Sequence, residues 1–201
     1  MTLADKMTTA RLVLAPVFFG IFFFPRFLPF FGVTANDYGI GWTVPVLWII
    51  FVVAEITDFL DGMIARKRGE VSDFGKLFDP FADTLTQVTF FLCFVVDGIL
   101  PPFLFLVVLY REFGILFIRN LMLKKGISLG ARISGKLKTV TYILAAALAL
   151  LASSVSRLDL LPQLYPWLIL AAKAAFALSV IIAVLSFFDY LMILRKNTEK
   201  L

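Results

Sequence analysis

Six apolar stretches, each long enough to cross a lipid bilayer as a helix, constrain this fold more than any other feature. They cover residues 10–31, 43–65, 79–98, 101–123, 137–156 and 164–194. A helix needs about 20 mostly apolar residues to cross the hydrocarbon core. Because lipid offers the backbone no hydrogen-bond partners, a crossing segment satisfies its own amides as a helix. No strand-like alternation persists, so the sequence predicts an all-α bundle of six transmembrane helices.

The composition is that of a membrane protein and excludes several other classes. Of the 201 residues, 61% are hydrophobic and 16% are charged, whereas ordinary soluble domains are about half apolar and a quarter charged. These values exclude a secreted disulfide scaffold, a disordered chain and a nucleic-acid-binding domain. No linker or internal repeat interrupts the sequence. We therefore expect one integral membrane domain over residues 1–201, with residues 1–9 at the membrane surface.

The lack of histidine narrows the chemistry open to the chain. Without histidine, the sequence contains no Ser-His-Asp triad and no histidine zinc site. Its single cysteine, Cys93, excludes an internal disulfide. Carboxylates are therefore the groups expected to carry any proton transfer, since lysine, tyrosine and cysteine give up their protons at much higher pH.

The basic residues predict the orientation in the membrane. Of the 19 lysines and arginines, only Arg26, Arg157 and Lys173 belong to the half opposite the termini. Six crossings place both termini on one side, together with the basic loops near residues 66–76 and 124–138. Because cytoplasmic loops are enriched in lysine and arginine, we expect both termini, and an active site at this end, to be cytoplasmic.

Acidic residues occur near the cytoplasmic end of the second helix, where a charge within a membrane is costly and points to function. At 3.6 residues per turn, Asp58, Asp61, Gly62 and Ala65 share one stripe of this helix. The two small residues on the stripe leave room for a ligand beside the carboxylates.

The third helix carries a matching pair, Asp79 and Asp83, which are four residues apart and share one face. A short basic loop makes the second and third helices antiparallel neighbours, so the two carboxylate pairs are expected to face each other. Four such carboxylates repel one another, and divalent cations would relieve the repulsion. All-oxygen ligands favour Mg²⁺ or Mn²⁺, with Ca²⁺ as a competitor, and two pairs suit two ions. The alternative is that the aspartates are solvated or paired with Arg66, Lys67 and Arg68.

These acidic residues belong to a longer pattern with fixed spacing. It reads Asp58-x2-Asp61-Gly62-x2-Ala65-Arg66-x8-Gly75-x3-Asp79-x3-Asp83, and it resembles the complete signature of the CDP-alcohol phosphatidyltransferases. Four further segments are similar to the bacterial phosphatidylglycerophosphate synthases of that family, namely residues 7–11, 79–83, 111–119 and 135–139. The resemblance covers roughly residues 5–142, whereas the last two helices match in hydropathy alone.

The resemblance implies a reaction in which a phosphatidyl group passes from CDP-diacylglycerol to an alcohol and CMP is released. The four aspartates of the signature would hold two Mg²⁺ or Mn²⁺ ions, with Asp83 as the general base. The nucleotide pocket would be lined by four other motif residues, Gly62, Ala65, Arg66 and Gly75. The family also implies a homodimer in the bacterial cytoplasmic membrane.

The same resemblance makes sn-glycerol 3-phosphate the expected acceptor alcohol. This small molecule is anionic and needs a cationic pocket, for which the candidates are Arg111, Arg119, Arg132, Lys136 and Lys138. For Arg111 the alternative is an ion pair within the membrane, with Glu112 or Glu55. For Lys136 and Lys138 the alternative is contact with lipid headgroups.

Other functions are weighed against this one. Thr84 and Ala4-Asp5 depart from residues often found in those synthases, so inositol phosphate, inositol, serine and choline are alternative acceptors. A divalent-cation transporter is the alternative of a different class. An inactive scaffold is a third, although none of the signature aspartates is missing. The sequence assigns no role to Glu55 or Asp189.

Overall fold

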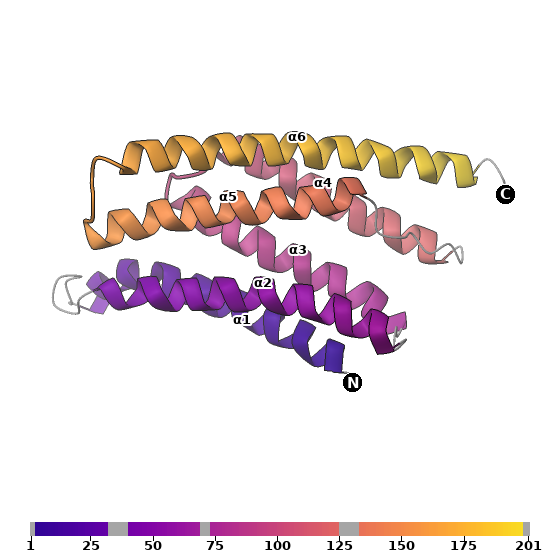
Figure 1. The fold of residues 1–201 in the computed structure, drawn as a ribbon, viewed down its shortest axis with the longest axis horizontal. Coiled ribbons are helices and arrows are strands. Elements are labelled where there is room, and N and C mark those ends of the chain that lie inside the picture. Colours follow the sequence, from indigo (N-terminus) through magenta and orange to yellow (C-terminus); the bar gives the residue numbers. More distant parts are fainter. Residues whose placement is uncertain (1–2, 32–39, 69–72, 125–132, 199–201) are drawn as a thin grey trace.

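A computed structural model describes residues 3–31, 40–68, 73–124 and 133–198 of the chain (Figure 1). Within these ranges the protein consists of helices and turns without strands, so the predicted all-α class is confirmed. The helices follow in the order α1 (Leu3–Phe27), η1 (Leu28–Phe31), η3 (Ile40–Trp42), α2 (Thr43–Arg68), α3 (Asp73–Val96), α4 (Pro102–Lys124), α5 (Ile133–Leu158) and α6 (Tyr165–Thr198).

Each predicted apolar stretch corresponds to one α-helix, but three helices start at least four residues earlier than expected, among them α5, which begins at Ile133 rather than at residue 137. Helix α3 begins at Asp73 rather than at residue 79, because Asp73, Gly75 and Lys76 interrupt its first turns and leave them outside the apolar run. Asp79 and Asp83 are therefore inside α3. Helix α1 begins at Leu3 rather than at residue 10, so residues 3–9, which were expected at the membrane surface, form the first turns of this helix.

Three segments among the described residues are both long and apolar enough to cross a membrane: Lys6–Phe30, Leu137–Leu158 and Tyr165–Met192. Several such helices in one chain indicate a multi-pass membrane protein. The expectation of six crossings stays a prediction, as does the side of the membrane on which the termini lie.

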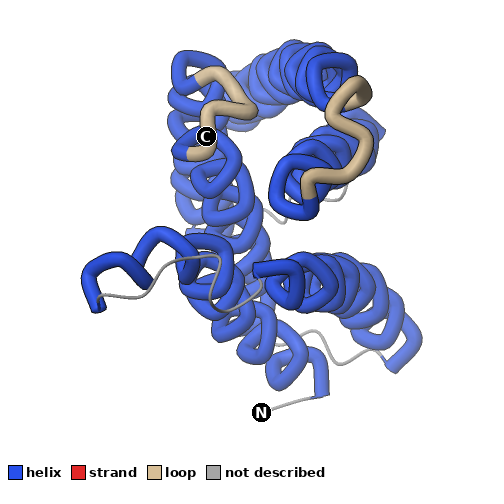
Figure 2. Tube along the Cα trace, turned by 90° about the vertical axis from the view of Figure 1, so that its left-hand side faces the viewer, coloured by secondary structure: helices blue, strands red, loops and turns tan. Residues whose placement is uncertain are grey.

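The helices form two groups of three that run along a common direction. Helix α1 packs against α2 and α3, while α6 packs against α5 and α4, and α3 joins the groups through α4 and α5. Figure 1 shows the N- and C-terminal parts at one end, which we call the terminal end. Figure 2 faces the other end, the turn end, with its turns near residues 97–101 and 159–164. Gly98 adopts a φ of 76° in the first of these turns, a conformation that glycine takes without steric cost.

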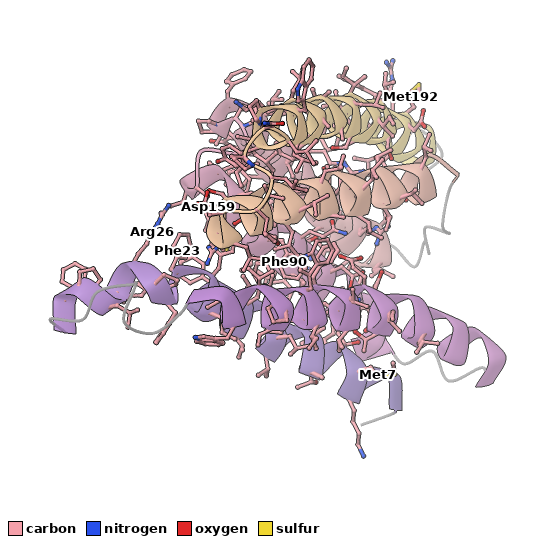
Figure 3. All side chains as sticks on the ribbon, turned by 60° about the vertical axis from the view of Figure 1, so that its left-hand side comes forward. Met7, Phe23, Arg26, Phe90, Asp159 and Met192 are labelled. Carbon is pink, nitrogen blue, oxygen red and sulfur yellow. The ribbon has the colours of Figure 1, made fainter. Side chains whose placement is uncertain are left out.

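Aromatic rings centred on α3 hold the two groups together. The ring centroids of Phe18 and Phe90 lie 4.5 Å apart, which joins α1 to α3, and Phe90 is near the middle of the bundle (Figure 3). About 100° further round α3, the ring centroid of Phe91 lies 5.2 Å from that of Tyr142 in α5 and 4.8 Å from that of Phe176 in α6. Buried aromatic pairs of this kind each contribute about 0.5–1.5 kcal/mol beyond the burial of their area, so α3 is the central element of the core.

Small residues bring the last three helices close together. Five alanines of α5 and α6 are buried: Ala145, Ala149, Ala152, Ala172 and Ala183. In α4, a Cβ atom added at Gly114 would lie 2.9 Å from the ring of Phe187 in α6. Because small side chains let helix backbones approach closely in membranes, this packing fixes the spacing of the helices that carry the polar residues described below.

Four polar residues link the helices at the turn end and form the turn-end cluster, Arg26, Asp97, Ser153 and Arg157. Arg26 and Asp97 make an ion pair of 2.7 Å, and Ser153 Oγ donates to Asp97 over 3.3 Å. Arg157 donates to Ser153 Oγ and to the backbone carbonyl of Phe22 at 3.1 and 2.8 Å. The cluster thus joins α1, the turn after α3, and α5.

Candidate active site

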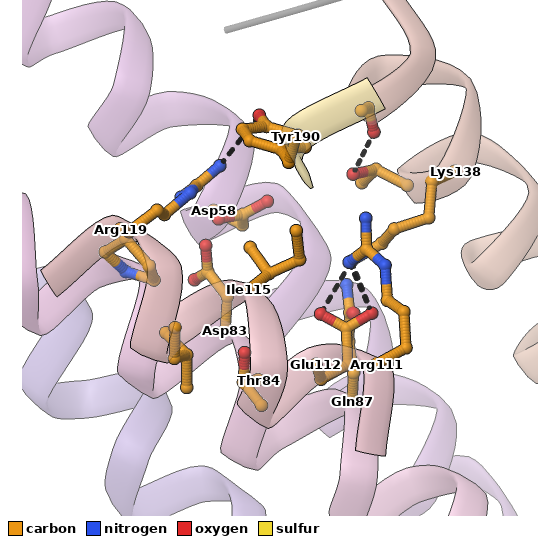
Figure 4. Close-up of a pocket in the computed structure, with 14 residues that line it drawn as sticks. Asp58, Asp83, Thr84, Gln87, Arg111, Glu112, Ile115, Arg119, Lys138 and Tyr190 are labelled. Atoms are coloured by element: carbon orange, nitrogen blue, oxygen red, sulfur yellow. Dashed lines mark hydrogen bonds and ion pairs between the residues drawn. The ribbon is translucent and has the colours of Figure 1, made fainter. Parts of the chain in front are cut away.

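A polar cavity of about 220 Å³ lies between five helices, toward the terminal end (Figure 4). Its lining comes from α2 (Asp58), α3 (Pro80, Asp83, Thr84 and Gln87), α4 (Arg111, Glu112, Ile115, Leu116 and Arg119), α5 (Gly135, Lys138 and Thr139) and α6 (Tyr190). The sequence predicted five of these residues as site residues, and they belong to four different helices. The fold therefore brings the predicted acidic and basic residues to one space.

The acidic wall of the cavity is formed by Asp58 of α2 and Asp83 of α3. Both carboxylates make an ion pair with the same nitrogen, Nη1 of Arg11 in α1, and the contact to Asp83 Oδ1 measures 2.7 Å. The Arg11 side chain is 2% exposed, whereas the two carboxylates are about one-third exposed. Two carboxylate oxygens that meet at one cationic atom must lie close together, as the sequence predicted for these two residues.

Helix α1 also contacts a third aspartate of the signature, Asp79. Thr8 Oγ1 donates a hydrogen bond of 2.7 Å to Asp79 Oδ1. Thr8 and Arg11 are three residues apart and thus on one face of α1. Glu55, one turn before Asp58, lines a small neighbouring cavity together with Arg11. The N-terminal turns of α1 therefore serve as a polar surface for the carboxylates of α2 and α3.

The opposite wall is a buried ionic network around Glu112 of α4. Glu112 accepts hydrogen bonds from Lys138 Nζ at 3.0 and 3.1 Å and from Arg111 Nη1 at 2.8 Å. Arg111 also donates to the carbonyl of Ala183 and to Ser186 Oγ in α6, at 3.1 and 3.3 Å. Arg111 and Glu112 are both less than 10% exposed. The alternative weighed for Arg111, an ion pair with Glu112, is thus present in the structure.

Arg119 is the basic residue of the cavity that this network does not include. Its Nη2 donates to the Tyr190 hydroxyl over 3.4 Å, and its guanidinium lies 5.8 Å from the centre of the Tyr190 ring. Its buried Nε makes no hydrogen bond within the described part of the chain. Arg119 therefore has hydrogen-bonding capacity directed toward an anion in the cavity.

Some predicted residues lie outside what the structure describes. Arg132 is outside the described ranges altogether. The side chains of five others are also outside them: Asp61, Gly62, Ala65 and Arg66 in α2, and Lys136 in α5. Gly75 is described and buried in the first turn of α3. The backbone of α2 and α3 thus places the predicted nucleotide positions near the terminal end, beside the acidic wall.

The donor set of the acidic wall fits a divalent cation. Its described ligands are carboxylate oxygens, which Mg²⁺ and Mn²⁺ prefer, and Asp58 and Asp83 already share one cationic atom in Arg11. Among the side chains that the structure describes, no group of three acidic residues is close enough to hold an ion by itself. A complete site would therefore also need Asp61, whose side chain lies outside the described ones, or oxygen atoms of the substrate.

Several residues in or beside the cavity were not predicted as functional. Arg11 and Thr8 belong to the segment 7–11, whose resemblance to known synthases was the available signal. Tyr190 lies in the last helix, where hydropathy gave no signal for an individual residue. Glu112 pairs with Arg111 beside it and with Lys138, which is 26 residues away in the sequence. Helical periodicity predicts contacts within one helix and gives no information on such a long-range pair.

Comparison with known proteins identifies the family. A family model described as CDP-alcohol phosphatidyltransferase matches residues 1–185 of the chain. The chain belongs to this family. The match extends into α6, well beyond the part of the sequence that carries recognisable motifs, and it confirms the resemblance inferred from the aspartate signature.

Curated bacterial relatives of this CDP-alcohol phosphatidyltransferase are similar over most of their length. The CDP-diacylglycerol–glycerol-3-phosphate 3-phosphatidyltransferase of Treponema pallidum is 40% identical over 192 residues, which are 95% of this chain and 88% of the relative. The protein of the same name from Bacillus subtilis is 32% identical, over 74% of this chain and 76% of its own. A probable phosphatidylglycerophosphate synthase of Mycobacterium tuberculosis is 33% identical, over 76% and 67%.

Proposed function

We propose that this CDP-alcohol phosphatidyltransferase transfers a phosphatidyl group from CDP-diacylglycerol to sn-glycerol 3-phosphate, giving phosphatidylglycerophosphate and CMP. The names of the relatives from Treponema pallidum and Bacillus subtilis specify these two substrates. The observation that carries the proposal is that one cavity is lined both by Asp58 and Asp83 and by Arg119 and the Glu112 network, which together we call the basic wall. An acidic wall suits a cation-dependent diphosphate donor, and a basic wall suits an anionic acceptor.

The acidic wall would carry the chemical step. The acceptor hydroxyl oxygen forms a bond to the phosphorus of the phosphatidyl group, and the bond from that phosphorus to the CMP oxygen breaks. Asp83 takes the hydroxyl proton, and CMP leaves with the bonding electrons. Asp58, Asp61, Asp79 and Asp83 would hold two divalent cations, Mg²⁺ or Mn²⁺, whose charge would offset the negative charge of the diphosphate.

The CMP part of the donor would lie beside the last turns of α2 and the first turn of α3. This is where the signature places its small residues and one arginine, Gly62, Ala65, Arg66 and Gly75. Small residues let a flat base or ribose approach the helix backbone, and an arginine can bind phosphate through two parallel hydrogen bonds. The donor's acyl chains would remain in the membrane.

The basic wall would bind the phosphate of the acceptor. Arg119 would be its main partner, because Arg111 and Lys138 already donate to Glu112. The three residues Arg111, Lys138 and Glu112 together carry one net positive charge, and Arg119 adds a second. Lys136 and Arg132 are candidates for further contacts at the rim. A neutral acceptor such as inositol would leave this charge uncompensated, which favours a phosphorylated alcohol.

The protein would lie in the bacterial cytoplasmic membrane with both termini and the cavity on the cytoplasmic side. The distribution of lysine and arginine supports this orientation, and water-soluble glycerol 3-phosphate and CMP would then exchange with the cytoplasm. A homodimer is the assembly that family membership favours.

The experiment that tests the function is an acceptor panel. Purified protein in detergent receives CDP-diacylglycerol, Mg²⁺ and one of five acceptors: glycerol 3-phosphate, inositol phosphate, inositol, serine or choline. We expect CMP release with glycerol 3-phosphate, loss of release after chelation and recovery with Mg²⁺ or Mn²⁺. Release with another acceptor alone would reassign the substrate, and no release with any acceptor would overturn the proposal.

A further inference from the structure

Helix α1 places a buried cation between carboxylates that the mechanism assigns to a metal ion. Arg11 is 2% exposed, and its Nη1 contacts Oδ1 of both Asp58 and Asp83. The family signature assigns no function to this arginine. A guanidinium is always charged and is costly to bury without anionic partners, so these contacts stabilise Arg11 as much as they stabilise the carboxylates.

We propose that Arg11 is a resident counter-ion, which holds Asp58 and Asp83 together and which a divalent cation must displace from at least one of them. This inference rests on the proposed metal site. It makes Arg11 a positioning residue, because it acts on the substrates only through the carboxylates. The same oxygens cannot serve the guanidinium and a metal ion at full strength, since the two cations repel each other at such short range.

The neighbouring contact of α1 supports this role. Thr8, on the same face as Arg11, donates to Asp79 Oδ1 at 2.7 Å. One turn of α1 therefore contacts three of the four signature aspartates, which belong to two other helices. Carboxylates on separate helices would repel and separate without a cation. Arg11 keeps them in place between turnovers, at the cost of weaker metal binding.

The test measures metal binding directly. The full-length protein in detergent is titrated with Mn²⁺, and free Mn²⁺ is followed by electron paramagnetic resonance for the wild type and for Arg11→Met. Methionine fills similar space without charge. We expect Arg11→Met to bind Mn²⁺ about tenfold more tightly, the size of effect that one adjacent charge has on ionic equilibria. The metal-free variant should also melt at a lower temperature and gain more from added Mn²⁺ than the wild type does.

The matched control is Arg157→Met, which removes a partly buried arginine from the turn-end cluster. It should change the Mn²⁺ affinity by less than about twofold, because distant sites act independently. A purely structural role of Arg11 would loosen the carboxylates and weaken Mn²⁺ binding. Unchanged or weaker Mn²⁺ binding in Arg11→Met therefore overturns the proposal. Mn²⁺ binding that is detected in Arg11→Met but not in the wild type supports it.

If Arg11→Met does not fold, Arg11→Lys decides the question. Lysine keeps the charge and should therefore leave the Mn²⁺ affinity within about threefold of the wild type, so binding as tight as about tenfold above the wild type would show that charge is not the cause and would overturn the proposal. Absence of Mn²⁺ binding in all forms would overturn it as well. The acceptor panel detects CMP release independently, so the proposed transfer reaction can stand when this inference fails.

Discussion

The first three helices and the last three contribute opposite charges to one cavity. Helices α2 and α3 supply Asp58 and Asp83, while α4 and α5 supply Arg111, Arg119 and Lys138. The two groups of helices meet mainly through α3, so the cavity lies where the groups join. The division matches the proposed reaction, in which a metal-bound donor and an anionic acceptor are held next to each other by groups of opposite charge.

The walls also differ in how their charges are compensated. The two carboxylates of the acidic wall are about one-third exposed and are bonded to a side chain of a third helix, Arg11. In the basic wall, Glu112 is 4% exposed and is bonded to Arg111 and Lys138 within the core. An exposed carboxylate can exchange partners, whereas a buried ion pair cannot lose one without a large penalty. We infer that the acidic wall is built for exchange and the basic wall for rigidity.

The largest expected effect comes from the acidic wall. Asp83→Asn removes the proposed base, and CMP release should fall by about 10³-fold, since general bases contribute about 10²–10⁴. Steady-state release with saturating CDP-diacylglycerol and glycerol 3-phosphate measures it, with the melting temperature as the control for folding. Activity within tenfold of the wild type would restrict the acidic wall to binding.

The second effect tests the rigidity of the basic wall. Glu112→Gln keeps the shape of the side chain but leaves Arg111 and Lys138 without their shared anion. Breaking a buried ionic network by removing one partner costs about 3–5 kcal/mol, so the protein should lose about 3 kcal/mol of unfolding free energy. Denaturation in mixed detergent micelles measures the loss. An unchanged midpoint would mean that the basic wall is as adaptable as the acidic one.

A smaller effect separates the two substrates. Arg119→Met should raise the KM for glycerol 3-phosphate about tenfold, with kcat and the KM for CDP-diacylglycerol nearly unchanged, because a charged hydrogen bond contributes about 1.5–3 kcal/mol. Initial rates of CMP release at varied concentrations of each substrate give these constants. A higher KM for the donor instead would assign Arg119 to the diphosphate and contradict the division between the walls.

The smallest effect is expected at the turn end. Arg26 is half exposed, and its ion pair with Asp97 is of the kind that contributes about 0–1 kcal/mol. Arg26→Gln should therefore leave CMP release unchanged and lower the melting temperature only slightly. Loss of CMP release in this variant would show that the turn-end cluster is coupled to the cavity, and the contrast between the two ends would fail.

The helices were predictable because their signal is local. Each apolar run is long enough to form a membrane helix by itself, and the structure contains a helix at every one of the six. The start of α3 was missed because two charged residues and a glycine interrupt its first turns, so its helical structure extends beyond the apolar run. The aspartate signature was equally local, since the spacing of Asp79 and Asp83 fixes their common face on any helix.

Sequence alone thus determined the fold class, the family and the residues of the acidic signature. Only the tertiary structure decided which charges meet: Arg11 with Asp58 and Asp83, and Glu112 with both Arg111 and Lys138. The physical reason is that a side chain's face on its own helix follows from a period of 3.6 residues, whereas its partner on another helix depends on how the cores of all six helices pack.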